Sequence, residues 1–178
     1  MDEVDTLIAR YRAVGPNRDG TLHGLLANLR DPRVPEFVLA IVESTEVDPW
    51  TRISVLKSFE NFKARDSVLA QKLRKVFLGI VSSIPVPSED QRAVEAQQLV
   101  RSYAVRALHP QCQLQEVTNV LVPILMNPEE DSYVREAAFH AVVDSAPWPE
   151  REPMVRAMLN DKHLAKTARV ELAYRNRN

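Results

Sequence analysis

Few residues of this chain have the type and spacing that chemistry requires. His109 and Cys112 stand three positions apart across Pro110, which is the spacing of half a metal site. The chain holds four histidines and one cysteine, and no second pair has ligand spacing. We therefore expect no metal site, and we interpret His109 as a loop histidine and Cys112 as a small buried thiol. Apart from its being the only cysteine, nothing in the sequence supports a reactive-thiol role for Cys112.

Glu129, Glu130 and Asp131 form an acidic cluster of the kind that acid–base catalysis could use. They precede an expected helix, and negative charge is favourable at a helix N-terminus, so the cluster needs no catalytic role. For His140, in the same expected helix, we expect a solvent-facing or repeat-interface position. The sequence also lacks the glycine-rich loops of nucleotide sites and the Gly-x-Ser-x-Gly elbow of hydrolases. These observations predict a protein that is not an enzyme and needs no cofactor.

Two groups of side chains are candidates for partner binding. The region of the fifth expected helix is basic, with Lys63, Arg65, Lys72, Arg74 and Lys75. A solvated helix face is the simplest interpretation, and the alternative is an electrostatic docking strip for an acidic partner or a phosphate backbone, centred on Lys72 and Lys75. Trp50 and Trp148 each follow a proline at an expected corner between helices. We interpret both as corner plugs, whereas exposed tryptophans would indicate binding hot spots.

Composition bounds the class of protein. About 45% hydrophobic and 26% charged residues in 178 positions are typical of one globular domain, which we assign to 1–178. Lysine plus arginine (23) nearly equals aspartate plus glutamate (24), so a nucleic-acid partner is not expected. The single cysteine and the absence of a signal-peptide pattern after Met1 favour a cytoplasmic location for a free-standing protein. The longest apolar run, 120–126, is too short for a transmembrane segment.

Hydrophobic periodicity predicts an all-α fold. Apolar residues recur at helical spacing in about ten segments, and no segment alternates with the period of a strand. The predicted helices cover 2–13, 20–30, 34–45, 49–62, 66–84, 88–108, 113–126, 131–145, 150–160 and 162–174. Asp48 is expected to cap the fourth, and Ser88 with Gln91 resembles a capping box for the sixth. Pro123 lies inside the seventh and should kink it.

The helices repeat a short pattern. An aspartate cap is followed by an aliphatic residue at +3, an arginine at +4 and a small apolar residue at +7. Asp131, Val134, Arg135 and Ala138 fit fully; Asp48 with Arg52, Gln97 with Val100 and Arg101, and Asp161 with Leu164 fit in part. Positions 48, 97, 131 and 161 are separated by 49, 34 and 30 residues, which indicates an insertion in the first interval. The arginine is expected to reach the capping aspartate or carbonyls of a neighbouring repeat.

Such paired helices cannot bury their apolar faces alone and must stack on one another. The pattern is typical of HEAT or armadillo-like repeats. We therefore expect a HEAT-like α-α solenoid, a right-handed superhelix of about five antiparallel helix pairs. A fold of this kind offers an extended surface for a protein partner, so the first functional hypothesis is a scaffold for protein–protein interaction.

Residues 121–147 also resemble the helical domain of the large lipid transfer proteins, which include vitellogenin, the apolipophorins and the microsomal triglyceride transfer protein. The matching positions are Pro123, Ile124, Asn127, Glu130, Asp131, Arg135, Ala137, Ala138, Phe139, Ser145 and Pro147. The stretch 56–61 is similar to an earlier turn of that family but has Glu60 where the family has glycine. The resemblance implies an arched double layer of helices that supports β-rich, lipid-carrying domains, and a secretory or extracellular location.

A third hypothesis is an enzyme built on the HEAT fold, such as a DNA glycosylase or a chromophore lyase. That activity would need a concave basic or acidic site, which the sequence does not display. Co-purifying lipid would favour the second hypothesis, and salt-dependent DNA binding would favour the third.

Overall fold

The computed structural model describes residues 2–14 and 20–175, and every regular element within those ranges is helical. This confirms the all-α prediction. The helices are α1 (Glu3–Val14), α2 (Thr21–Ala27), α3 (Arg33–Glu43), α4 (Pro49–Phe59), α5 (Ser67–Val81), α6 (Gln91–Leu108), α7 (Gln115–Met126), α8 (Ser132–Val143), α9 (Trp148–Ala157) and α10 (Ala165–Arg175), with short 3-10 helices at His109–Gln111 and Met158–Asn160.

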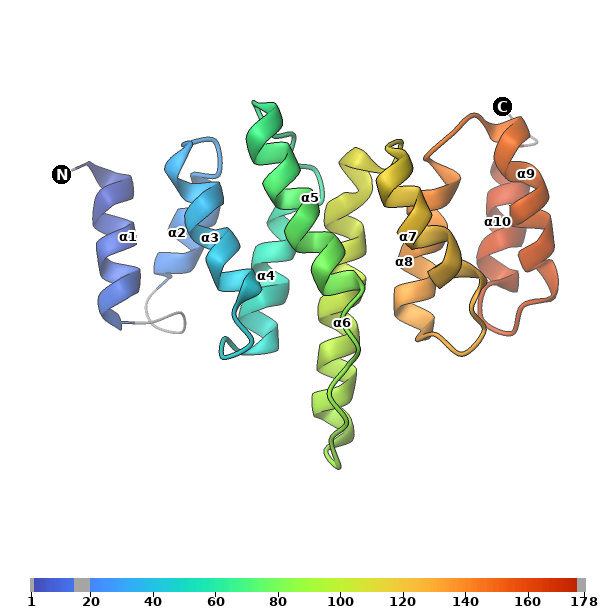
Figure 1. Cartoon of the computed structure of the whole chain (residues 1–178), viewed down its shortest axis with the longest axis horizontal. Helices are drawn as coiled ribbons and strands as arrows, with labels where there is room; N and C mark the ends of the chain where they lie inside the picture. The colour runs from blue at the N-terminus through green and yellow to red at the C-terminus, as the bar shows by residue number, and fades with distance from the viewer. Residues whose placement is uncertain (1, 15–19, 176–178) are drawn as a thin grey trace.

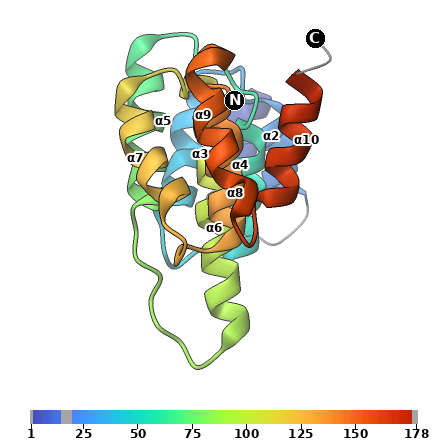
Figure 2. The same ribbon diagram turned by 90° about the vertical axis from the view of Figure 1, so that its right-hand side faces the viewer.

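The helices stand side by side in a row, with α1 at one end and α9 and α10 at the other (Figure 1). Each odd-numbered helix contacts the even-numbered helix that follows it, and α4, α6 and α8 contact one another in series. Viewed along the row, α5 and α7 lie on one side and α2 and α10 on the other (Figure 2). The core therefore runs along the row as a continuous apolar layer between two sets of helices.

Aspartates fix several helix starts. The Asp48 carboxylate accepts a hydrogen bond from Thr51 N at 3.0 Å, as predicted, and Asp131 caps α8 in the same way through Val134 N at 3.2 Å. The capping box predicted at Ser88 is wrong. The cap of α6 is Asp90, which accepts from Arg92 N at 2.9 Å, while the Ser88 hydroxyl accepts from Asp90 N. A carboxylate is favoured there because it also complements the positive end of the helix dipole.

The long first interval of the repeat pattern is filled by a protruding helix end and an extended segment. Helix α6 begins at Gln91, six residues before Gln97, and its first turns extend beyond the other helices (Figures 1 and 2). The segment 83–90 runs back alongside it. Gln97 fastens this segment, because its side chain accepts from Val86 N at 2.7 Å and donates to Val86 O at 3.4 Å.

Small and aliphatic residues of the repeat pattern lie in the core. Val100, Val134, Ala138 and Leu164 are all at most 2% exposed, so adjacent helices approach closely at these positions. Pro123 lies inside α7, as expected. Across residues 2–14 and 20–175, we find no helix with the combined length and apolar character needed to cross a membrane.

Candidate functional site

The cysteine and histidines that the sequence offered as candidates for chemistry do not form a reactive site in the described residues. Cys112 is buried, and burial raises the pKa of its thiol, which disfavours the reactive thiolate. His109 Nε2 lies 3.0 Å from Asp144 Oδ2 at the surface. In the described part of the chain, no three histidine, cysteine or acidic side chains come together as metal ligands would. His140 is exposed, as expected, with its ring against the edge of Phe139.

The acidic cluster before α8 is likewise used within the fold. Asp131 caps the helix, and Glu130 accepts hydrogen bonds from the Asp131 backbone N–H at 2.9 Å and from Arg101. The hydrogen bonds from Arg101 lower the pKa of Glu130 below its ordinary value. Glu129 is exposed. Because each carboxylate is either paired or exposed, the cluster holds no pair poised for acid–base chemistry.

Three arginines of the repeat pattern share one geometry. The Nε of Arg52, of Arg101 and of Arg135 donates to a backbone carbonyl in the last turn of the preceding helix. The acceptors are Val42 O at 2.9 Å, Val81 O at 3.1 Å and Leu125 O at 3.1 Å, in α3, α5 and α7 respectively. Carbonyls at a helix C-terminus have no partner within the helix and carry partial negative charge, so a guanidinium satisfies and stabilises them. We call these three side chains the arginine row.

Two members of the arginine row also bind a carboxylate of the next helix pair. Arg101 forms a two-pronged ion pair with Glu130, at 2.7 and 2.8 Å. Arg135 forms one with Asp161, at 3.2 and 2.6 Å, and its side chain is only 2% exposed. The prediction therefore gives the right kinds of partner but the wrong places. The carbonyl belongs to the other helix of the arginine's own pair rather than to a neighbouring repeat. The carboxylate belongs to the following pair rather than to the arginine's own cap. Arg101 and Arg135 therefore tie successive helix pairs together.

Arg52 differs from the other two. Its side chain is half-buried, and its bond to Val42 O is its only hydrogen bond or ion pair among the described residues. The position that corresponds to Asp161 is Gln97, which is neutral and is bonded to Val86. Burial lowers the pKa of Arg52, but a guanidinium keeps its charge in proteins. Arg52 therefore presents a cation without a carboxylate.

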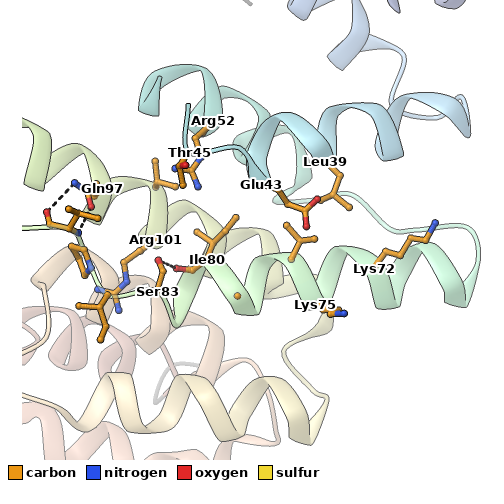
Figure 3. Close-up of a pocket in the computed structure, with 16 residues that line it drawn as sticks. Leu39, Glu43, Thr45, Arg52, Lys72, Lys75, Ile80, Ser83, Gln97 and Arg101 are labelled. Carbon is orange, nitrogen blue, oxygen red and sulfur yellow. Dashed lines mark hydrogen bonds between the residues drawn. The ribbon is translucent and has the colours of Figure 1, made fainter. Parts of the chain in front are cut away.

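This cation lies in an open groove of about 610 Å³ between α3, α5 and α6 (Figure 3). Leu39 and Glu43 line it from α3, Lys72, Lys75, Gly79 and Ile80 from α5, and Val100 and Arg101 from α6. The segment after α5 adds Ile84 and Val86, which are 89% and 68% exposed. The groove thus combines cationic groups with exposed apolar surface, a combination suited to binding a protein segment.

The two lysines singled out from the sequence both line this groove. Lys72 is paired with Glu36 at 2.5 Å, whereas Lys75 is exposed and has no ion pair within the described ranges. Arg74 points to another surface, where it binds Glu116 at 2.7 Å. The basic region of α5 is therefore divided between two surfaces.

The two tryptophans differ in environment. Trp148 is partly buried against the core and lies beneath the guanidinium of Arg175, 5.6 Å from its ring, as a corner plug would. Trp50 is 64% exposed, so its interpretation as a corner plug is wrong. Thr51 and Ile53 of the same helix occupy the inward positions, which leaves Trp50 on the outward face.

Comparisons with known proteins provide no identification. No family model matches the chain, and neither a curated protein nor a solved structure resembles it significantly. The interpretation of the site therefore rests on its geometry.

Sequence reasoning missed most of the groove. The predicted helix 66–84 included Ile84 as an apolar residue, whereas α5 ends at Val81 and Ile84 is 89% exposed. Gly79 and Val86 had no predicted role, because a helical glycine and a proline-flanked apolar residue are common in proteins. The available signal was the long first interval of the repeat pattern, since the residues that fill it form one wall of the groove.

The ion pair between Arg135 and Asp161 predicts a pH dependence. Hydrogen bonds from Arg135 lower the pKa of Asp161 from 3.8 to about 2 in the folded chain. A depressed carboxyl pKa contributes stability that is fully present above pH 4 or so and is lost as the pH falls toward about 2. We expect the difference in unfolding free energy between the wild type and Asp161→Asn to shrink across that window in urea titrations. A difference that stays constant with pH would contradict the assignment.

Proposed function

We propose that this chain is a non-catalytic scaffold that binds a protein partner in the groove between α3, α5 and α6. The observation that carries the proposal is the groove itself, which is open, about 610 Å³ in volume and lined by apolar surface beside cations. A site for a small substrate would be expected to enclose its ligand and to bring catalytic groups together. On the groove wall, Glu43 is the only carboxylate, and Thr45 and Ser83 carry the hydroxyl groups. No histidine lines the groove.

We also propose that the row of helices is a HEAT-like right-handed superhelix of about five antiparallel pairs. Support comes from the arginine row, in which three helices repeat the same hydrogen bond to the preceding helix. The equal burial of Val100, Val134 and Leu164 at one pattern position is a second argument. An experimentally determined structure would test both the hand and the number of pairs.

The lipid-carrier and enzyme hypotheses receive less support. In residues 121–147, Glu130 and Arg135 form ion pairs between helices, and the Ser145 hydroxyl donates to Val142 O within its own turn. Those features serve helix packing and need no lipid. For a glycosylase or lyase, the groove offers no histidine and only the one carboxylate of Glu43.

A site-specific cross-linking experiment tests the scaffold. A photoreactive amino acid is introduced at Gly79, where an added Cβ would meet nothing within 4 Å, and separately at Val170, which is exposed on α10. We expect a stoichiometric protein adduct from position 79 and none from position 170. Native mass spectrometry and lipid extraction accompany it. Bound lipid without a protein adduct, or equal labelling from both positions, would overturn the proposal.

A further inference from the structure

The partner's chemistry can be inferred from the arginine row. Arg101 and Arg135 each use Nε for a backbone carbonyl and the remaining nitrogens for a carboxylate. Arg52 makes the same Nε bond, but Gln97 replaces the acid and is engaged with Val86. The outer nitrogens of Arg52 have no partner among the described residues, although the side chain is half-buried. A planar guanidinium fixed in this way matches a carboxylate in two-pronged geometry.

A glycine on the groove wall gives a second, independent observation. Gly24 is explained by packing inside the chain, because a Cβ there would lie 3.1 Å from Leu7 Cδ2. Gly79 is not, since a Cβ would meet nothing within 4 Å. Glycine in a helix interior costs about 1 kcal/mol relative to alanine. Its position leaves the backbone of α5 bare where the groove passes, which is the room that an incoming main chain requires.

The charges of the groove favour an acidic occupant. Lys72 and Arg101 are neutralised by Glu36 and Glu130, so these two cations contribute little to the attraction of an acidic ligand. Arg52 and Lys75 remain without an ion pair in the described ranges, against the single carboxylate of Glu43. The exposed side chains of Ile84 and Val86 add apolar area at one end. A mixed acidic and aliphatic segment complements both features.

We propose that the groove binds an extended segment of a partner protein, and that an aspartate or glutamate of this segment pairs with the guanidinium of Arg52. The main chain of the segment crosses α5 at Gly79, and a neighbouring aliphatic side chain covers Ile84 and Val86. The bound carboxylate takes the place in the arginine row that Glu130 and Asp161 fill for the other two arginines. This inference rests on the proposed scaffold function and specifies the partner that it accepts.

Selection from a random peptide library displayed on phage tests the inference directly. Peptides selected on the wild-type chain should share an aspartate or glutamate next to aliphatic residues. Selection on Arg52→Gln should lose that enrichment. For the best peptide, Arg52→Gln should weaken binding by about ten- to a hundredfold, the range expected for hydrogen bonds to a charged group. Fluorescence anisotropy at physiological salt measures the dissociation constants.

Two further variants keep the test independent of folding. Because Arg52 also bonds to Val42 O, Arg52→Gln could lower stability, so circular dichroism must show that it is folded. Gly79→Trp leaves that bond intact and fills the groove; it should weaken the same peptide by a factor of about ten or more. Arg156→Gln on α9, an exposed arginine paired with Glu152, is the matched control and should bind normally.

Several results would overturn the inference. These are the selection of no peptide, selected peptides without an acid, enrichment of acids that persists on Arg52→Gln, and Arg52-dependent binding of phosphatidylserine vesicles instead of peptide. The scaffold proposal is separable from it. If a partner is cross-linked from position 79 but its affinity is unchanged by Arg52→Gln, the scaffold proposal stands and the proposal of an acidic segment fails. If no partner is cross-linked, both proposals fail.

Discussion

Replacing Arg135 with alanine is expected to lower the free energy of unfolding by about 3–5 kcal/mol, the range for breaking a buried ion pair by removing one partner. Arg135 is 2% exposed and holds both Leu125 O, through two nitrogens at 3.1 Å, and the Asp161 carboxylate. Its loss removes both guanidinium donors from Leu125 O and the donor to Asp161 Oδ2, while Asp161 Oδ1 keeps the backbone N–H groups of His163 and Leu164. Each orphaned group keeps most of its desolvation penalty.

Urea denaturation followed by circular dichroism measures this change. The control is Arg156→Ala, which removes an exposed pair with Glu152 on α9 and should cost about 0.5 kcal/mol or less. A double-mutant cycle with Asp161→Ala should show coupling, because the two side chains are in direct contact. Equal losses for Arg135→Ala and Arg156→Ala would mean that the arginine row does not hold the helix pairs together.

Much of the fold follows from the sequence, because helix periodicity and capping act locally. The ten helices appear near their predicted positions, and Asp48 and Asp131 cap as expected. Asp90 was missed in favour of Ser88, since both are good caps and the choice depends on where the chain leaves the extended segment. N-cap preferences therefore identify the residues that can cap a helix, but they do not decide between two candidates that lie close together in the sequence.

The candidate site was less predictable, because it depends on contacts between distant elements. The pattern identified Arg52, Arg101 and Arg135, but not the carboxylates that bind Arg101 and Arg135 or the lack of one beside Arg52 in the described residues. Arg101 binds Glu130 and Arg135 binds Asp161, which are not at equivalent pattern positions, so small differences in how the pairs stack decide the partner. A proline before Trp50 indicated a corner but not which side of the corner faces the core.

The absence of an acid at Gln97 has a structural counterpart. Gln97 holds Val86, and a neutral amide can both donate to and accept from one residue's backbone, which a carboxylate cannot. The insertion therefore accounts for both unusual features of the groove. It supplies the apolar segment, and it removes the acid that would otherwise neutralise Arg52.

Replacing Phe59 with alanine is expected to cost about 3–5 kcal/mol, the range for deleting a fully buried ring. Phe59, the last residue of α4, is 1% exposed and contacts the rings of Phe62 and Phe77 at centroid distances of 5.3 and 5.5 Å. Aromatic pairs of this kind add to the burial itself. Because Phe77 belongs to α5, the cluster fixes the helix that carries Lys75 and Gly79.

The Phe59 variant therefore links stability to the proposed binding. Denaturant titration measures the free energy of unfolding, and fluorescence anisotropy measures the affinity for the selected peptide. Phe62→Ala is the matched control, because that ring is only partly buried and lies beyond the end of α4. It should lose less stability and leave peptide binding near the wild-type value. Comparable losses of stability for both variants would show that the contact between Phe59 and Phe77 is not what anchors α5. Weaker binding by the Phe59 variant alone, measured while it is still folded, would show that the groove depends on how α5 is seated.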